Sequence, residues 1–156
     1  MSEAAFDSLG LHPKTLAAIE KVGYTSPSPI QAALIPIALT GRDCIGQART
    51  GTGKTAAFML PAMERVDTKE PAIQVLVLAP TRELSEQVMI ESERLCGKRL
   101  KVALGVGGRP IATQIRALQS GAQVLIGTPG RVIDLLRRGA LKLDRLKIVV
   151  LDEADR

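Results

Sequence analysis

Short apolar runs alternate along the chain with longer stretches in which apolar residues recur every three or four positions. The runs occupy residues 43–47, 73–79, 101–106, 124–126 and 147–151, and most are rich in Val, Ile and Leu. Nearly continuous apolar runs are typical of strands buried on both faces, and the helical spacing between them is typical of the crossovers that connect parallel strands. The pattern predicts an α/β fold, a three-layer parallel-sheet domain with about five strand–helix repeats.

Capping and turn residues mark where the predicted helices begin and end. The first helix spans residues 13–22, with Pro13 in its first turn and Gly23 at its end. Ser28 is placed to cap a second helix that begins at Pro29. Further helices are predicted at about 54–66, from 82 to about 95, from 111 to near 121, and after Thr128.

Polar or glycine-rich segments follow the five apolar runs. Parallel strands joined by right-handed crossovers place the loops at their carboxyl ends on one edge of the sheet, where ligands of such sheets bind. The segments after residues 47, 79, 106, 126 and 151 are therefore expected to form one functional edge.

The segment Ala48-Arg-Thr-Gly-Thr-Gly-Lys-Thr55 lies between a predicted strand and a predicted helix, the setting of a phosphate-binding loop. Its glycines tolerate the positive φ angles that turn successive backbone N–H groups toward an anion. Lys54 is expected to contact the β- and γ-phosphates, and the Thr55 hydroxyl to hold Mg²⁺. Because Ala48 replaces the first glycine of the strict pattern, a turn that binds nothing stays an alternative.

Two acids directly follow the last apolar run. Asp152 stands where a carboxylate completes Mg²⁺ coordination next to a phosphate-binding loop, through water. Glu153 is placed to orient or deprotonate an attacking water, which favours hydrolysis over transfer to a second substrate. The alternative is a solvated acidic turn.

Gln31 lies in the first turn of the second predicted helix. Its side-chain amide both donates and accepts, which matches the N7 acceptor and N6 donor on one edge of adenine. The alternative is an ordinary solvent-exposed glutamine.

Three further elements on the expected functional edge suit an anion. Thr81 and Arg82 follow the second apolar run, a Gly-Gly pair ending at Gly108 follows the third, and Thr128 and Arg131 follow the fourth. Hydroxyl, guanidinium and exposed backbone N–H groups bind phosphate. Each element is also explained by a helix start or a structural turn.

The composition fits a folded domain with an aliphatic core and an anionic partner. Of 156 residues, 46% are hydrophobic, yet only 2 are Phe, 1 is Tyr and none is Trp. The formal net charge of +5 favours a polyanion.

Cysteine usage and hydropathy indicate a reduced, intracellular setting. Cys44 and Cys96 lie far apart and match no metal-ligand spacing. The first residues lack the apolar core of a signal peptide, and no apolar run approaches membrane-spanning length. The chain is therefore predicted to be cytoplasmic, with no membrane partner. His12, the only histidine, is expected at the surface without a catalytic role.

The motifs together resemble those of a known family. In chain order they are Ala-Arg-Thr-Gly-Thr-Gly-Lys-Thr, Pro-Thr-Arg-Glu-Leu, Gly-Gly, Thr-Pro-Gly-Arg and Asp-Glu-Ala-Asp. This set resembles the first domain of DEAD-box RNA helicases, and residues 23–31 resemble that family's adenine-recognition segment. The resemblance covers nearly the whole chain. It implies a Q-motif segment at 1–31 and a partial RecA-like ATP-binding domain of the P-loop NTPase class at 32–156.

The resemblance implies a role for each matching residue. Gln31 would recognise the adenine of ATP, with Tyr24 stacking near it and Phe6 supporting the segment. The phosphates would be held by Arg49, Thr50, Gly51, Thr52, Gly53, Lys54 and Thr55. The RNA sugar–phosphate backbone, read without regard to base sequence, would contact Pro80, Thr81, Arg82, Gly108, Thr128, Gly130 and Arg131. Lys54, Asp152 and Glu153 would be the catalytic residues, and Thr55 and Asp152 would bind Mg²⁺. Asp155 would link the ATP site to neighbouring motifs. Ala48 is usual in this family, and Ser85 stands where the family usually has alanine.

The family's pattern continues beyond Arg156 with a Ser-Ala-Thr motif and a second RecA-like domain, which this chain lacks. That domain would supply the arginines that stabilise the γ-phosphate transition state. The resemblance also implies that a strand after Asp152 lies beside the strand that ends at Leu151. We therefore expect an incomplete sheet that can close through a second copy of the chain, and nucleotide binding with little turnover.

Three functions fit these features. The first is the ATP-binding half of an RNA-dependent ATPase that separates short duplexes. The second is a nucleotide switch or ATPase that acts on proteins, which Gln31 and the RNA-type motifs disfavour. The third is a non-catalytic module that binds nucleotide or RNA weakly, and for this chain in isolation it describes the expected behaviour best.

Overall fold

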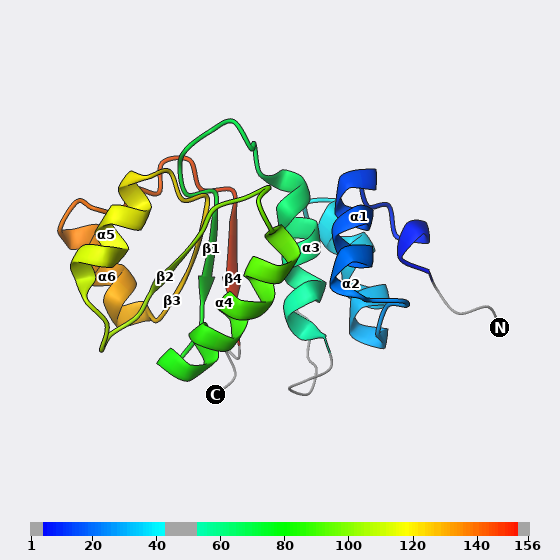
Figure 1. Ribbon diagram of the computed structural model, residues 1–156, viewed down its shortest axis with the longest axis horizontal. Coiled ribbons are helices and arrows are strands. Elements are labelled where there is room, and N and C mark those ends of the chain that lie inside the picture. The colour runs from blue at the N-terminus through cyan, green and yellow to red at the C-terminus, as the bar shows by residue number, and fades with distance from the viewer. Residues whose placement is uncertain (1–4, 43–52, 153–156) are drawn as a thin grey trace. The chain divides into compact units, whose positions relative to one another are not determined.

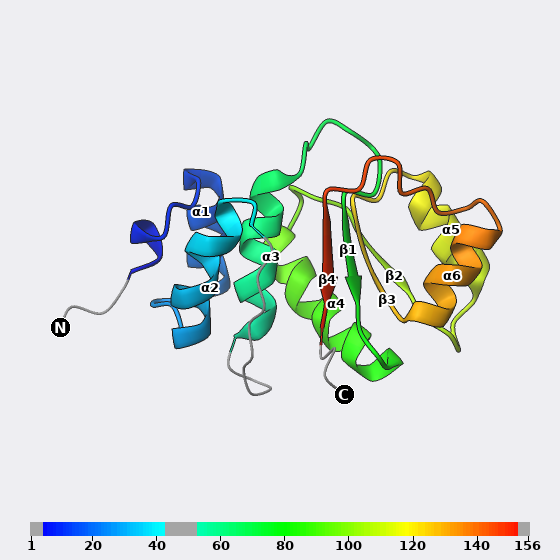
Figure 2. The same ribbon diagram turned by 180° about the vertical axis from the view of Figure 1, so that it is seen from behind.

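The computed structural model describes residues 5–42 and 53–152. They form two compact units that divide between Arg65 and Val66 (Figures 1 and 2). In this described part of the chain no helix is long and apolar enough to cross a membrane. The expected strand at 43–47 lies outside the described residues, as do Arg49, Thr50, Gly51, Thr52, Glu153 and Asp155.

The first unit is helical. It contains a short 3₁₀ helix η1 (Phe6–Ser8) and the helices α1 (Pro13–Val22), α2 (Pro29–Leu39) and α3 (Lys54–Arg65). The predicted bounds of α1 and the predicted start of α2 are confirmed, because local chemistry specifies them. Gly23 closes α1 with a φ of 95°, and Ser28 forms a reciprocal capping box with Gln31 at the start of α2.

Contacts within the first unit place α1 and α2 against α3. The backbone N–H of His12 donates to Glu64 Oε1 at 2.8 Å, which ties the start of α1 to the end of α3. His12 is exposed, as predicted, and its Nδ1 accepts from the N–H of Lys14 at 3.1 Å, so this residue caps α1. Ile35 of α2 and Leu60 of α3 are fully buried.

The second unit is a parallel four-stranded sheet with helices on both faces. Its strands are β1 (Val75–Leu78), β2 (Val102–Gly105), β3 (Val124–Gly127) and β4 (Ile148–Leu151), in the spatial order β2-β3-β1-β4. Helix α4 (Arg82–Cys96) covers one face, and α5 (Ile111–Gln119) and α6 (Pro129–Arg137) cover the other (Figure 1). The predicted α/β class and three-layer parallel arrangement are confirmed.

The core of this unit is aliphatic, as the composition predicts. Leu76 and Leu125, which are partners in the register of β1 and β3, pack with Leu135 of α6 in one buried cluster. Because all four strands are parallel, the loops after Leu78, Gly105, Gly127 and Leu151 lie at the same edge of the sheet. The prediction that these four loops share one edge of the sheet is therefore confirmed.

One prediction about the last strand is wrong. The run 147–151 is predicted to be a buried strand, but Val149 is 51% exposed and Leu151 62% exposed. Val149 is the register partner of Leu76, so it lies on the sheet face that α5 and α6 cover over the neighbouring strands. Strand β4 ends the sheet among the described strands, beyond that cover. Self-association through this edge stays a prediction.

Candidate functional sites

In the first unit, Gln31 connects helix α2 to the end of the glycine-rich loop. Its Oε1 accepts a hydrogen bond from the backbone N–H of Ser28 at 2.9 Å, and its Nε2 donates to the carbonyl oxygen of Gly53 at 3.1 Å. The side chain is only 4% exposed, so the alternative of an ordinary exposed glutamine is wrong.

To contact adenine, the side-chain amide of Gln31 needs a donor and an acceptor that its protein hydrogen bonds do not use. A side-chain amide has two N–H donors and two acceptor lone pairs. The two bonds described above use one of each. One donor and one acceptor are left on the same amide, which is the pair that a bidentate contact with adenine requires.

The two aromatic residues of the segment lie against each other. The ring centroids of Phe6 and Tyr24 are 6.4 Å apart with an interplanar angle of 21°. Phe6 is 6% exposed, whereas Tyr24 is half-buried. The stacked contact fixes one face of the tyrosine ring and is consistent with a supporting role for Phe6.

The last residues of the glycine-rich loop lead directly into helix α3. Gly53 has a φ of 82°, and a methyl group at this position would overlap Gln31 Nε2. Lys54 and Thr55 are half-buried and form the first turn of α3. The first N–H groups of a helix have no intrahelical acceptor, so this turn presents donors suited to a phosphate.

Asp152 directly follows β4 in the second unit. Its backbone N–H donates to the carbonyl oxygen of Leu78 at 2.8 Å, and the residue is 8% exposed. The bond continues the β1–β4 ladder by one residue and fixes the start of the acidic loop. Thr55, the other predicted Mg²⁺ ligand, belongs to the first unit.

All seven residues predicted to contact RNA belong to the second unit, on the functional edge. Thr81 and Arg82 lie at the start of α4 after β1, Gly108 follows β2, and Thr128 and Arg131 flank the start of α6 after β3. Most are exposed and the rest are half-buried, as a binding surface requires; the full set is Pro80, Thr81, Arg82, Gly108, Thr128, Gly130 and Arg131.

Arg82 lies against the loop that follows β2. Gly108 has a φ of 79°, and a methyl group built on it would stand 2.5 Å from Arg82 Nη1. The Arg82 Nε donates to Glu86 Oε1 at 3.1 Å, one turn further along α4. The absent side chain at Gly108 therefore leaves the space that the guanidinium occupies.

Arg131 is anchored by a buried glutamine. Its Nη1 donates to Gln114 Oε1 at 3.0 Å and to the carbonyl oxygen of Arg109 at 3.2 Å. Gln114 is 6% exposed, and its Nε2 donates to the carbonyl oxygen of Val106 at 2.9 Å. These bonds link the loop after β2, helix α5 and helix α6, and they fix one amino group of the Arg131 guanidinium.

Thr81 and Thr128 precede helices α4 and α6 and differ as helix caps. The Thr81 hydroxyl accepts from the N–H of Leu84 at 3.2 Å, so Thr81 caps α4 and its O–H is still able to donate. Thr128 occupies the N-cap position of α6, but its side chain makes no capping hydrogen bond within the described part of the chain. Because Pro129 has no N–H and sets the helical φ by itself, α6 starts here without that bond.

Three residues of this edge were missed in the sequence. Glu86 accepts hydrogen bonds from Arg82 and Arg109, Arg109 bridges toward Arg131, and Gln114 holds Arg131. The hydrogen bonds from Arg109 and then Arg82 lower the pKa of the Glu86 carboxyl below its ordinary value. A signal existed for two of them: Glu86 is four residues after Arg82 on a helix, and Gln114 lies on the apolar face of its helix, three residues after Ile111.

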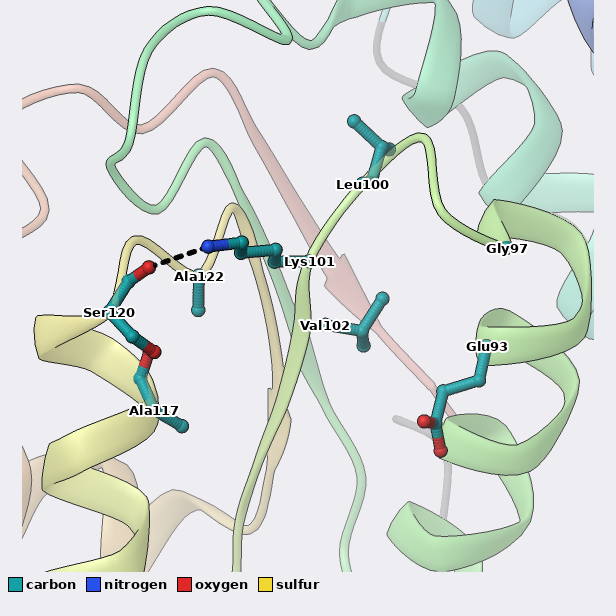
Figure 3. Close-up of a pocket in the computed structure, with 8 residues that line it drawn as sticks. All are labelled: Glu93, Gly97, Leu100, Lys101, Val102, Ala117, Ser120 and Ala122. Carbon is teal, nitrogen blue, oxygen red and sulfur yellow. Dashed lines mark hydrogen bonds between the residues drawn. The ribbon is translucent and has the colours of Figure 1, made fainter.

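A pocket of about 360 Å³ lies away from this edge (Figure 3). It is lined by the end of α4, the start of β2 and the end of α5, where Lys101 Nζ donates to the carbonyl oxygen of Ser120 at 2.9 Å. These are the amino ends of the strands, so none of the predicted site residues lines it.

Residues 28–156 match the family model described as DEAD/DEAH box helicase, and the chain belongs to this family. It is 53% identical over 151 residues to a DEAD-box ATP-dependent RNA helicase CshA from Streptococcus pneumoniae, which covers 96% of this chain and 29% of that protein. It is 48% identical over 158 residues to an ATP-dependent RNA helicase DeaD from Buchnera aphidicola, which covers 99% of this chain and 26% of that protein. The chain thus spans less than a third of these relatives.

Solved structures show the same fold. A DEAD box protein from the hyperthermophile Methanococcus jannaschii matches with a TM-score of 0.89 and 43% identity, over 97% of this chain and 42% of that one. S. cerevisiae Dbp5 bound to RNA and ADP BeF₃ matches with a TM-score of 0.82 and 38% identity, over 97% of this chain and 38% of that one. The fold is therefore the RecA-like α/β fold of DEAD-box proteins.

Proposed function

We propose that this chain binds ATP and the RNA sugar–phosphate backbone, as the first RecA-like domain of an ATP-dependent RNA helicase. The observation that carries the proposal is the gathering of Arg82, Gly108 and Arg131 on one sheet edge, where two guanidinium groups are held by protein acceptors. Guanidinium groups held in place bind phosphate at low entropic cost, and contacts of this kind do not depend on base sequence.

Adenine recognition is assigned to residues 1–31, with Gln31 as the reading side chain. The unused donor and acceptor of its buried amide support this role, as does its bond to Gly53 beside the phosphate-binding segment. Tyr24, supported by Phe6, offers an aromatic surface in the same segment. The second unit and the remainder of the first form the RecA-like part at 32–156.

The phosphates are assigned to Arg49, Thr50, Gly51, Thr52, Gly53, Lys54 and Thr55. The start of α3 immediately after Gly53 supports the assignment, since a helix N-terminus attracts anions. The Thr55 hydroxyl and the Asp152 carboxylate are hard oxygen ligands suited to Mg²⁺, which would neutralise charge on the phosphates. Glu153 would then orient the attacking water for hydrolysis.

Binding measurements on the 156-residue chain test the proposal. We expect a fluorescent ATP analogue with Mg²⁺ to bind and to be displaced by ATP more readily than by GTP, and Lys54→Ala to weaken that binding. We also expect single-stranded RNA to bind with an affinity that falls as salt rises and that falls again in Arg131→Gln. Salt-independent RNA binding, or RNA binding unchanged in Arg131→Gln, would contradict the RNA assignment. Equal displacement by ATP and GTP would contradict the adenine assignment.

The setting of the activity is also proposed. Cys96 is buried and, among the described residues, a free thiol, which fits a reducing cytoplasm. The ATP-dependent separation of RNA duplexes is proposed only for a longer protein that carries this domain together with a second RecA-like domain.

A further inference from the structure

Arg109 is the residue through which the two predicted RNA-binding arginines of the second unit are connected. Its guanidinium donates from Nε to Glu86 Oε1 at 2.9 Å and lies 2.8 Å from the same oxygen through Nη2. That oxygen also accepts from Arg82 Nε at 3.1 Å. On its other side, the backbone carbonyl of Arg109 accepts from Arg131 Nη1 at 3.2 Å.

The shared carboxylate holds Arg82 and Arg109 side by side on the functional edge. Both arginines bind it by one edge of the guanidinium, so each keeps further N–H donors. The Nη1 group of Arg109 makes no hydrogen bond within the part of the chain that the structure describes. The Arg109 side chain is 51% exposed, which leaves that group accessible to a ligand.

The local charge favours an anionic ligand. Arg82, Arg109 and Arg131 carry three positive charges, and among the described residues Glu86 is the single acid bonded to them. The guanidinium groups of Arg82 and Arg109 share one oxygen of Glu86, Oε1. The three arginines and one acid leave a net positive surface with fixed donors. This geometry suits phosphate, because planar guanidinium groups bind phosphate oxygens through paired N–H donors.

We propose that Arg109 is a third RNA-backbone contact on this edge, which binds a phosphate of the same strand that Arg82 and Arg131 contact. The inference rests on the proposed RNA-binding function and extends it to a residue outside the family-type motifs. Arg109 immediately follows Gly108, so the proposed contact extends the glycine turn by one side chain.

The competing explanation is that Arg109 only forms a surface ion pair with Glu86. Exposed ion pairs contribute little to stability, and this one would then be indifferent to RNA. The two explanations differ in one readout. A phosphate contact releases counterions, so its loss changes the dependence of RNA affinity on salt, whereas the loss of a surface ion pair does not.

The experiment compares the wild-type 156-residue chain with Arg109→Gln, Arg131→Gln and Arg138→Gln. Arg138 is the matched control, because it is 53% exposed and pairs with Asp134 at the end of α6, outside the functional edge. Fluorescence anisotropy with labelled oligouridine and oligoadenosine measures RNA affinity over a salt series. Thermal unfolding followed by circular dichroism shows that each variant is folded.

We expect Arg109→Gln to reduce the magnitude of the salt slope for single-stranded RNA by about 0.7. The ratio of wild-type to variant affinity should then shrink about threefold between about 50 and about 200 mM salt. The effect should be equal for the two oligomers, because a phosphate contact does not depend on the base. Arg138→Gln should match the wild type. Binding of a fluorescent ATP analogue should not change in Arg109→Gln, which distinguishes an RNA phosphate from a nucleotide phosphate.

The outcomes separate this inference from the proposed function. A reduced slope in Arg131→Gln with an unchanged slope in Arg109→Gln would overturn the role of Arg109 and leave the RNA-binding function standing. Equal reductions in Arg109→Gln and Arg138→Gln would show a general effect of surface charge and would also overturn it. A wild-type chain that binds neither oligomer would overturn both.

Discussion

Gln31 Nε2 donates a hydrogen bond to the carbonyl oxygen of Gly53, 3.1 Å away and 22 residues along the chain. The same side chain closes the capping box of α2 through Ser28. A residue expected to read the base is thus bonded to the residue that precedes the predicted phosphate-binding turn of α3. The proposed base recognition and the local structure therefore depend on the same side chain.

Gln31→Ala is expected to abolish the preference for ATP over GTP and to lower stability moderately. The substitution removes the amide proposed to pair with adenine. It also leaves the N–H of Ser28 and the carbonyl oxygen of Gly53 without this partner, for which a loss of about 1–3 kcal/mol is typical. Competition of ATP and GTP for a fluorescent analogue measures the first effect, and urea unfolding the second. Gln119→Ala is the control, since Gln119 is exposed at the end of α5. An ATP-to-GTP ratio that stays at the wild-type value would rule out adenine reading by Gln31.

Gly127→Ala is expected to destabilise the second unit by about 1–3 kcal/mol or more. A methyl group on Gly127 would overlap the carbonyl oxygen of Gly105, its register partner in β2. The obstacle is backbone within a sheet, which cannot move aside as a flexible side chain does. Urea unfolding measures the loss.

The control for Gly127→Ala is Gly130→Ala in the first turn of α6. A methyl group there meets no atom of the described residues within 4 Å. Its effect on stability should stay within about 0.5 kcal/mol or be slightly favourable. Similar losses in the two variants would contradict the steric explanation.

The features that sequence predicts well here are those determined by neighbours in the chain. The bounds of α1 follow from Pro13 and Gly23 and the start of α2 from Ser28 and Pro29, residues whose effects act within one helical turn. The β-branched runs likewise predict buried parallel strands, because the pattern is contained in a few consecutive residues. Burial of β4 was not predictable in this way, because the exposure of Val149 depends on how far α5 and α6 extend across the sheet.

The site follows the same division. Glycine-rich and Thr/Arg segments predict which loops carry chemistry, and parallel topology predicts that they share an edge. The bonds that orient Arg131 were not predictable, because Arg109 and Gln114 belong to other elements and meet it only in the fold. The Arg82–Glu86 bond differs, since both residues lie one turn apart on α4. Likewise, the sequence places Gln31 in a first turn but does not show that Gly53 accepts from it.

Gln114→Met is expected to weaken RNA binding while leaving the salt slope close to that of the wild type. Methionine has a similar volume but offers Arg131 no amide oxygen, so the guanidinium keeps its charge and loses its anchor. The carbonyl of Val106 also loses its partner, for which about 1–3 kcal/mol of stability is the usual loss. RNA anisotropy over a salt series, compared with Gln119→Met, measures the effect. Wild-type RNA affinity in a destabilised variant would show that Gln114 serves stability alone.

Cys96 is expected to make the free energy of unfolding fall at alkaline pH. Burial raises the pKa of its thiol from 9.0 to about 12, and the residue is 3% exposed. A pKa raised in the folded state means that the contribution of the neutral thiol to stability is complete below pH 9.0 and is lost as the pH rises toward 12. Over this window the free energy of unfolding of the wild type should fall relative to Cys96→Ala, by at most about 1.4 kcal/mol per pH unit.

Urea unfolding of the two proteins between about pH 8 and about pH 10.5 measures this difference, and the comparison removes the contributions of lysine and tyrosine that both share. The smaller side chain of Cys96→Ala lowers stability equally at every pH, so only the slope of the difference carries information. Parallel pH profiles would mean that the thiol ionises as readily in the folded chain as in the unfolded one. Mass spectrometry after alkylation provides a second readout: Cys96 should react slowly until the chain unfolds, because a buried neutral thiol is a poor nucleophile.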